Sequence, residues 1–202
     1  MTKNVLIIDY GMGNVASVKK AFEKIGAQVK ISNSKKDIEK AEYLVLPGVG
    51  AFGDGIKNLT KFYLVDILNK AVLIDKKPFL GICLGMQLLA DKGLEFGTHQ
   101  GLGWIKGEVV KLKSPRLPHI GWNNIKIIKN DLFQDIPDDN FYFVHSYVLK
   151  PKNKSITTSV CKYGAEFPTS IQYGNIFATQ FHPEKSQLSG LKVLDNFLNF
   201  KH

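Results

Sequence analysis

The first half of the chain alternates short apolar segments with amphipathic ones, and no other sequence feature restricts the fold as strongly. The apolar segments NVLIIDY, AQVKIS, YLVLPG and PFLGI have the length and composition of buried strands. Between the first two, NVASVKKAFEKIG places apolar residues at helical spacing, and Gly26 ends that predicted helix. Further helices are expected around Lys36 to Lys40 and Leu59 to Lys70. Strands that alternate with helices in this way favour a parallel sheet with helices on its faces.

The second half of the chain has a different pattern. From about residue 104 onward, short alternating segments replace the helices, among them IKIIK, FYFVHSYVL, SITTSVCKYG, TSIQYG and IFATQFH. Gly174 and Asn175 separate the last two segments and predict a two-residue hairpin, while SGLKVLDNFLNF predicts a closing amphipathic helix. No repeat, linker or low-complexity segment interrupts the 202 residues. We therefore expect one domain over residues 1–202, an α/β fold with a mostly parallel central sheet flanked by helices and additional antiparallel strands in the C-terminal half.

The net charge of +9 raises the question of a nucleic-acid partner. Arg116 is the only arginine, whereas bidentate recognition of bases and phosphates prefers arginine to lysine. The lysines are interleaved with acids, as in SKKDIEKAE, which is typical of solvated helix faces. No nucleic-acid partner is therefore expected, and the charge leaves room only for a modest attraction to anionic metabolites or an acidic partner.

The cysteines and the apolar segments favour a cytoplasmic protein without a metal centre. Cys83 and Cys161 form no CxxC pair and no cluster with histidine, which argues against a zinc site or a disulfide framework and for a reducing compartment. The N-terminal apolar run is broken by Asp9 and is too short for a secretory signal. No later segment has the length and apolar character that a membrane span requires.

The stretch GMGNVA, Gly11 to Ala16, partly imitates a dinucleotide-binding fingerprint, because it follows a predicted strand and opens a predicted helix. That fingerprint needs a ribose-binding acid about twenty residues further on. The segment VKISNS supplies only Ser32, Asn33 and Ser34 there. A tight strand-to-helix turn that also suits a surface contact is therefore the favoured interpretation.

The stretch FLGICLGMQLL places Cys83 between two glycines, with an apolar run on each side. A predicted strand, then Cys83, then the predicted helix LGMQLLADK is the arrangement of a nucleophile elbow in the form G-x-C-x-G. Gly81 and Gly85 leave room for the sharp turn, and the positive end of a helix favours the thiolate, which is the reactive form. The alternative is a small residue packed in a core, since free cysteine is often buried. This motif alone leaves both interpretations open.

A cysteine nucleophile needs a base, and the base needs an orienting group. The segment FATQFHPEKS offers both, because His182 and Glu184 stand at i and i+2 after a predicted strand and so share one face of an extended backbone. Pro183 between them biases His182 towards the extended conformation. A lone histidine at a strand end is more often a surface or hydrogen-bonded structural residue. Together with the cysteine elbow, the pair favours a catalytic interpretation.

Acyl transfer also needs hydrogen-bond donors for an oxyanion. The elbow supplies the backbone N–H of Leu84. A second donor is expected from the glycine-rich loop LPGVGAFGDG, where Gly48 and Gly50 permit unusual backbone conformations and the close approach of a substrate. The alternative for this loop is a plain strand-to-helix turn.

Taken together, these motifs resemble the class I (triad-type) glutamine amidotransferases. GICLGMQLL and FHPEKS are similar to the nucleophile and histidine-glutamate motifs of that family, and the resemblance covers essentially the whole chain. It implies an enzyme that hydrolyses glutamine to glutamate and ammonia, with Cys83 as nucleophile, His182 as acid and base, and Glu184 orienting the histidine. The implied oxyanion donors are the N–H groups of Leu84, Val49 and Gly50.

The same resemblance implies the residues that surround glutamine, and it implies no cofactor and no metal. The residues expected to bind the substrate are Gly48, Gln87, Glu95, His145, Ser146 and Tyr147.

Within the class, DYGMGN, LPGVGAFGDG, LPHIGWN and FYFVHSY resemble glutaminase subunits that pass ammonia to a (β/α)₈-barrel cyclase subunit in histidine biosynthesis. This implies a heterodimer in which Asn14 and Trp122 lie towards the cyclase. It also implies that the loop Pro47 to Gly50 rests with its donors misdirected until the cyclase binds its ligand, which is allosteric coupling. A tryptophan in a loop rich in proline and glycine is either an interface anchor or a core aromatic, and the sequence leaves this open.

Two other enzyme interpretations remain. Another triad hydrolase on the same fold, such as a γ-glutamyl hydrolase or a cysteine peptidase, keeps the cysteine and histidine but does not require PGVG or Gln87. A paralogous glutaminase that supplies ammonia to another synthetase, for instance in amidino-sugar biosynthesis, fits the same motifs. An inert regulatory subunit is disfavoured because Cys83, His182 and Glu184 are all present.

Overall fold

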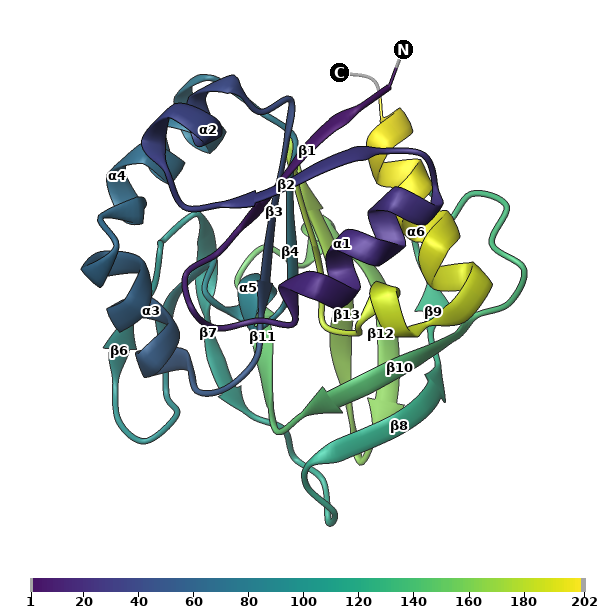
Figure 1. Ribbon diagram of the computed structural model, residues 1–202. Helices are drawn as coiled ribbons and strands as arrows, with labels where there is room; N and C mark the ends of the chain where they lie inside the picture. Colours follow the sequence, from purple (N-terminus) through teal and green to yellow (C-terminus); the bar gives the residue numbers. More distant parts are fainter. Residues whose placement is uncertain (1, 201–202) are drawn as a thin grey trace.

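The computed structural model describes residues 2–200 and is built around an eight-stranded mixed sheet with the strand order β2-β1-β3-β4-β14-β13-β12-β9 (Figure 1). Strands β2, β1, β3, β4 and β14 run parallel to one another, whereas the pairs β14-β13, β13-β12 and β12-β9 are antiparallel. The strands of this sheet are β1 Asn4–Ile8, β2 Gln28–Ser32, β3 Tyr43–Gly48, β4 Phe79–Cys83, β9 Lys126–Ile127, β12 Thr157–Tyr163, β13 Ala165–Tyr173 and β14 Ile176–Thr179. The expected sheet, parallel with antiparallel additions from the second half, is confirmed.

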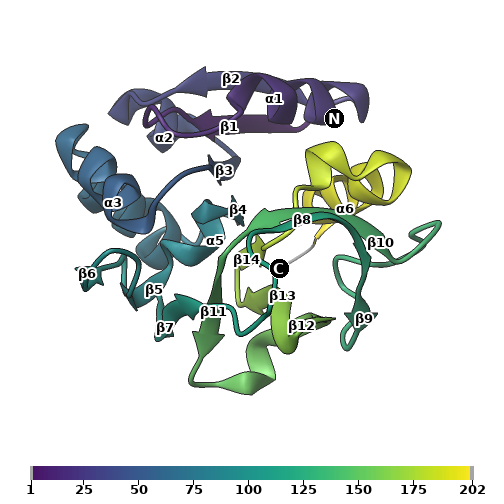
Figure 2. The same cartoon turned by 90° about the horizontal axis from the view of Figure 1, so that it is seen from below.

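Helices cover both faces of the parallel part, because successive side chains of a strand point to opposite faces. In β1, Val5 and Ile7 pack towards α1 and α6, whereas Leu6 and Ile8 pack towards α2, α3 and α4. Figures 1 and 2 show these two layers on opposite sides of the sheet. The helices are α1 Val15–Lys24, α2 Lys35–Lys40, α3 Phe52–Lys61, α4 Leu64–Asn69, the π-helix η1 Lys70–Ile74, α5 Leu84–Gln87, the 3₁₀ helices η2 Lys154–Ile156 and η3 Pro183–Lys185, and α6 Gln187–Asn199.

The strand-rich second half both extends this sheet and forms two smaller sheets beside it. The predicted hairpin is confirmed, since Tyr173 pairs with Ile176 and Gly174 has a φ of +57°. One small sheet has the strand order β11-β7-β5-β6 and the other pairs β8 with β10. Their strands are β5 Ala90–Gly93, β6 His99–Gln100, β7 Ile105–Lys111, β8 His119–Asn124, β10 Asn140–His145 and β11 Tyr147–Pro151.

Two helix predictions were wrong in their extent. The helix expected over Leu59 to Lys70 begins earlier, at Phe52, and is interrupted at Tyr63, whose φ of +55° breaks it into α3 and α4. The helix expected over LGMQLLADK ends at Gln87, and the next residues turn into β5, which pairs with β7. The residues around the end of α5 are apolar and buried on all sides, so their sequence lacks the periodicity that would distinguish a helix from a strand.

In the part of the chain that the structure describes, no helix is both long and apolar enough to cross a membrane.

Candidate active site

Cys83 ends β4 at the centre of the sheet, between β3 and β14, and α5 begins at the next residue. Its φ of 54° and ψ of −107° are rarely adopted by a residue with a side chain, and such conformations cost about 1–3 kcal/mol. Gly81 and Gly85 make the turn possible, because a Cβ on Gly81 would lie 2.7 Å from the carbonyl oxygen of Gly85 and one on Gly85 would overlap with the carbonyl oxygen of Leu46. The strained turn that the G-x-C-x-G spacing predicted is therefore present.

His182 and Glu184 lie beside this turn, because β14 is the parallel neighbour of β4. His182 has an extended backbone and precedes the short helix η3, which begins at Pro183. Its Nδ1 is 2.8 Å from Oε1 of Glu184, and both side chains are almost fully buried. The backbone of His182 is fixed as well, since its N–H donates to the carbonyl of Tyr142 and its own carbonyl accepts from Ser186 Oγ.

The protonation of His182 depends on its two neighbours. Burial alone would lower the pKa of His182, but the interactions with Cys83 and Glu184 outweigh burial and raise that pKa to about 10. Because Glu184 holds Nδ1, Nε2 is the ring nitrogen left to exchange a proton with Cys83. Among residues 2–200, this Nε2 is buried and has no hydrogen-bond partner. With a pKa this high, His182 carries its proton and a positive charge at neutral pH, next to Cys83.

The glycine-rich loop lies next to the elbow. Gly48 pairs with Cys83 in register across β3 and β4. A side chain at Gly48 would overlap with Oη of Tyr10 and would lie 2.8 Å from Cβ of Leu84. Val49 follows at the surface, and Gly50 has a φ of +100°, which favours glycine. The structure thus brings the loop and the N–H of Leu84 to the same end of the sheet, as an oxyanion site requires.

Gln87 ends α5 beside the elbow and Glu95 lies at the start of α3, and both are engaged within the protein. Gln87 is buried, and its Nε2 donates to the carbonyl of Tyr147 at 2.9 Å and to Oε1 of Gln180 at 3.1 Å. Both amide hydrogens of Gln87 are used, so only its Oε1 remains for a ligand. Oε2 of Glu95 accepts from the N–H of Phe52 at 2.8 Å and so caps α3, directly after the glycine-rich loop.

The segment His145 to Tyr147 connects β10 to β11. His145 is buried, with its Nδ1 3.1 Å from the carbonyl of Tyr147 and its Nε2 3.0 Å from Nδ1 of His119. The carbonyl of Ser146 accepts from the N–H of Leu112. The His145 side chain is therefore committed to the protein, and a contact of this segment with substrate would involve Ser146 or Tyr147.

Three buried residues, two of them beside the elbow and one behind His145, were missed by the sequence interpretation. Gln180, two residues before His182, has its Nε2 3.7 Å from Sγ of Cys83. Tyr10 is buried beside Gly48 with no hydrogen-bond partner for its hydroxyl among residues 2–200, and burial, with the nearby Cys83, raises its pKa. His119 lies in LPHIGWN and contacts His145. One sequence signal pointed to these residues, which is that each lies inside a motif already noted: DYGMGN, FATQFHPEKS or LPHIGWN.

The histidine pair makes the fold sensitive to acid. Burial lowers the pKa of His119 to about 4, and burial together with His119 lowers the pKa of His145 to about 3. An unfolded chain takes up these protons near pH 6.5, whereas the folded chain does not, so folding free energy is lost as the pH falls below that value. We expect the chain to lose about 2–5 kcal/mol between about pH 7 and pH 4.5. Urea unfolding at the two pH values measures this loss.

A matched control for this prediction is His99→Gln, because His99 lies outside the pair. It should keep the full acid loss, whereas equal stability of the unaltered chain at both pH values would contradict the assignment of two buried neutral histidines.

The two residues expected to lie towards a partner are both at the surface. Asn14 is the N-cap of α1 and accepts from the N–H of Ser17 at 3.3 Å. Trp122 in β8 is 45% exposed and contacts the ring of Tyr142 edge to face, so the core alternative for Trp122 is wrong. Trp122 also lines an open cavity of about 520 Å³ together with Asn140. A role of either residue in a contact remains a prediction.

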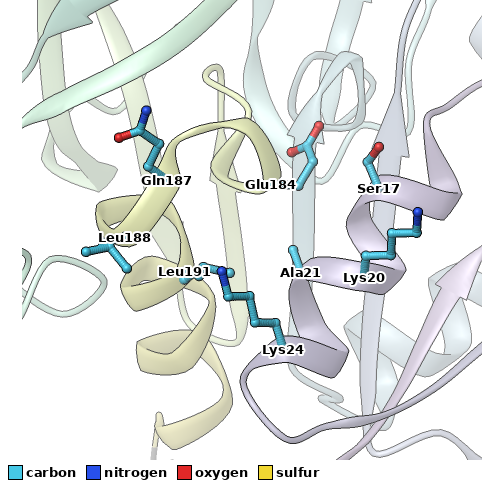
Figure 3. Close-up of a pocket in the computed structure, with 8 residues that line it drawn as sticks. All are labelled: Ser17, Lys20, Ala21, Lys24, Glu184, Gln187, Leu188 and Leu191. Carbon is cyan, nitrogen blue, oxygen red and sulfur yellow. The ribbon is translucent and has the colours of Figure 1, made fainter.

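A groove of about 500 Å³ lies between α1 and α6 and reaches Glu184 (Figure 3). Lys20 and Lys24 line it from α1, and Leu188 and Leu191 line it from α6. Figure 3 shows Glu184 at one end of this groove and Lys24 at the other. Within residues 2–200, no three histidine, cysteine or acidic side chains come together in a way that would hold a metal ion.

Comparison with known proteins agrees with this geometry. The family model for glutamine amidotransferase class-I matches residues 6–200, and the chain belongs to that family. It is 50% identical to imidazole glycerol phosphate synthase subunit HisH 1 of Campylobacter jejuni over 96% of this chain and 98% of that protein. It is 49% identical to the HisH subunit of Aquifex aeolicus, over 95% and 94% of the two chains.

A solved structure supports the fold independently. The structure of PurLQS from Thermotoga maritima aligns with a TM-score of 0.77 over 98% of this chain and 99% of that chain, at 19% identity. At this identity the likeness shows the fold and no more.

Proposed function

We propose that this chain is the glutaminase subunit of an imidazole glycerol phosphate synthase, which hydrolyses glutamine and delivers the ammonia to a cyclase subunit in histidine biosynthesis. The observation that carries the proposal is an identity of about one half, over nearly the full length, to HisH subunits. The buried cluster of Cys83, His182 and Glu184 supports the glutaminase part, because Glu184 is at hydrogen-bond distance from His182 and Cys83 is close enough to raise the pKa of that histidine.

In the proposed first half-reaction, the Cys83 thiolate attacks the side-chain carbonyl carbon of glutamine. The carbonyl oxygen becomes an oxyanion that the N–H groups of Leu84, Val49 and Gly50 stabilise. The tetrahedral intermediate then collapses, the carbon–nitrogen bond breaks, and Nε2 of His182 gives its proton to the departing nitrogen. Ammonia leaves, and a thioester joins Cys83 to the glutamyl group.

In the second half-reaction, neutral His182 takes a proton from a water molecule, which attacks the thioester carbon. Glutamate leaves, and the thiolate and imidazolium are restored. Glu184 accepts the hydrogen bond from Nδ1, which fixes the tautomer that leaves Nε2 free for proton transfer.

The glycine-rich loop and the segment after β10 would form the substrate pocket. Gly48 lacks a side chain beside Cys83 and allows glutamine to approach closely. Glu95 carries a negative charge suited to the α-ammonium group of glutamine, and Oε1 of Gln87 is available to the same group. Ser146 and Tyr147 complete the pocket, with His145 as their support.

The proposed partner is a (β/α)₈-barrel cyclase that forms a heterodimer with this chain, residues 1–202 acting as one glutaminase domain. Trp122 is exposed in β8, which pairs with β10, and the carbonyl of Val144 in β10 contacts Sγ of Cys83. Asn14 caps α1, which lines the groove that reaches Glu184, so contact with the partner at either residue would couple to the site. Thiols are kept reduced in the cytosol, and both cysteines are free, which supports the cytoplasm as the location.

Glutamate release from glutamine tests the function. The purified chain is assayed alone and together with the cyclase subunit of the same organism and the nucleotide ligand of that cyclase. We expect release to rise about 5- to 150-fold in the mixture, because the ligand of one subunit changes the state of the other. No increase, with a cyclase that is shown to be active on ammonium salts, would reject the cyclase as partner and point to another synthetase or another amide.

A further inference from the structure

Gln180 is a buried amide that the proposed mechanism does not use. It follows β14, is fully inaccessible to solvent, and precedes His182 by two residues. Its Nε2 lies 3.7 Å from Sγ of Cys83, within hydrogen-bond distance for a sulfur acceptor. Its own N–H donates to the carbonyl of Thr169, which fixes its backbone.

The orientation of the Gln180 amide follows from its neighbours. Nε2 of Gln87 donates to Oε1 of Gln180 and to the carbonyl of Tyr147. A carbonyl oxygen only accepts hydrogen bonds, so Gln87 must present its NH₂ group to both partners. Oε1 of Gln180 therefore faces Gln87, and the NH₂ group of Gln180 faces Cys83.

The hydrogen-bonded chain continues into the sheet of β8 and β10. Nδ1 of His145 must donate to the carbonyl of Tyr147, so Nε2 of a neutral His145 accepts from Nδ1 of His119. Nε2 of His119 then accepts from Nδ2 of Asn123 at 3.3 Å. In each hydrogen bond of this chain, the donor and the acceptor are therefore assigned.

We propose that Gln180 is a positioning residue that donates a hydrogen bond to the Cys83 thiolate, and that the chain from His119 through His145, Tyr147 and Gln87 holds its amide in the donating orientation. This inference rests on the proposed function only in taking Cys83 as the nucleophile. A hydrogen bond to the charged form favours ionisation, so Gln180 lowers the pH at which the thiolate forms and keeps the sulfur in line with the substrate carbonyl.

The test is the pH dependence of Cys83 alkylation by iodoacetamide in the free chain, followed by peptide mass spectrometry to separate Cys83 from Cys161. The variant Gln180→Met keeps a similar side-chain volume and removes the donor. We expect the midpoint of the pH profile to rise by about one unit, which lowers the rate about tenfold below the midpoint, while the plateau rate at high pH stays within about twofold. A residue that only fills space would not move the midpoint.

The other groups that act on Cys83 remain in this variant: His182 and Tyr10 are unchanged, and Glu184 still holds His182. The matched control is Thr179→Val, which removes a buried hydrogen bond to the carbonyl of Phe181 but no contact with sulfur. Its alkylation midpoint should equal that of the unaltered chain.

An unchanged midpoint in folded Gln180→Met would overturn the inference. If thermal unfolding shows that this variant does not fold, Gln180→Glu decides the matter, because it has the same shape and, once ionised, only accepts hydrogen bonds and places a negative charge beside the sulfur. Its midpoint should rise further, and an unshifted midpoint would again overturn the inference. The alkylation assay uses neither glutamine nor a partner. If the proposed function is wrong, glutamate release fails but the alkylation midpoint still shifts; if the role of Gln180 is wrong, the midpoint does not shift.

Discussion

Cys83→Ala is expected to reduce glutamine hydrolysis by the chain in complex with its partner by about 10⁴-fold or more, since no other group can form the thioester. Cys161 cannot substitute for it. Cys161 is buried in β12, and burial raises the pKa of its thiol to about 11, so at neutral pH it carries no thiolate. The measurement is steady-state glutamate release in the presence of the cyclase and its ligand.

The matched control is Cys161→Ala, which removes the other cysteine and should keep glutamine hydrolysis within a few-fold. In Cys83→Ala, binding to the partner and cyclase activity on added ammonium salt should be unchanged, because only the sulfur is removed from a buried turn. If Cys83→Ala still hydrolyses glutamine, the nucleophile is another residue and the assignment of Cys83, His182 and Glu184 as a triad is wrong.

The largest effect on stability is expected from Gly85→Ala. The added methyl group would overlap with the backbone carbonyl oxygen of Leu46 in β3. Neither atom can rotate away, because each is fixed to the backbone of a buried element. Relief requires α5 or β3 to move, which would also displace the paired residues Gly48 and Cys83. We expect a loss of about 3 kcal/mol or more in the free energy of unfolding, measured by urea titration.

Gly26→Asn is the matched control, because it adds a larger side chain at a glycine with open space around its Cβ position. Gly26 has a φ of +86° just after α1, a conformation that asparagine tolerates, so the cost should stay below about 1 kcal/mol. Equal losses in the two variants would mean that the elbow is not closely packed against β3.

The strands β3 and β4 were predictable because each is a continuous apolar segment bounded by turn residues, and both are fully buried. The end of α5 was not, since Leu88 and Leu89 are buried and suit helix or strand equally well. The helix ends where it does because β5 pairs with β7. This contact joins two separate segments, so no local sequence pattern predicts it.

In the candidate site, too, local contacts could be predicted from the sequence and contacts between distant segments could not. The His182–Glu184 contact follows from a spacing of two residues in extended backbone, so it could be predicted locally. Gln180 and Cys83 are separated by 97 residues, and His119 and His145 by 26, so the polar chain that joins them exists only once several strands have assembled. The engagement of Gln87 and His145 by backbone carbonyls was hidden for the same reason.

The neighbouring strands β4 and β14 bring together a cysteine and a histidine that are far apart in the sequence. During synthesis at about 5–20 residues per second, the histidine is added roughly 5 to 20 s after the cysteine. A growing polypeptide that has already folded β1 to β4 thus carries a sulfur without its proton carrier. Under the proposed mechanism, an unfinished chain that lacks the histidine is inactive on glutamine, and activity arises only when β14 takes its place between β4 and β13.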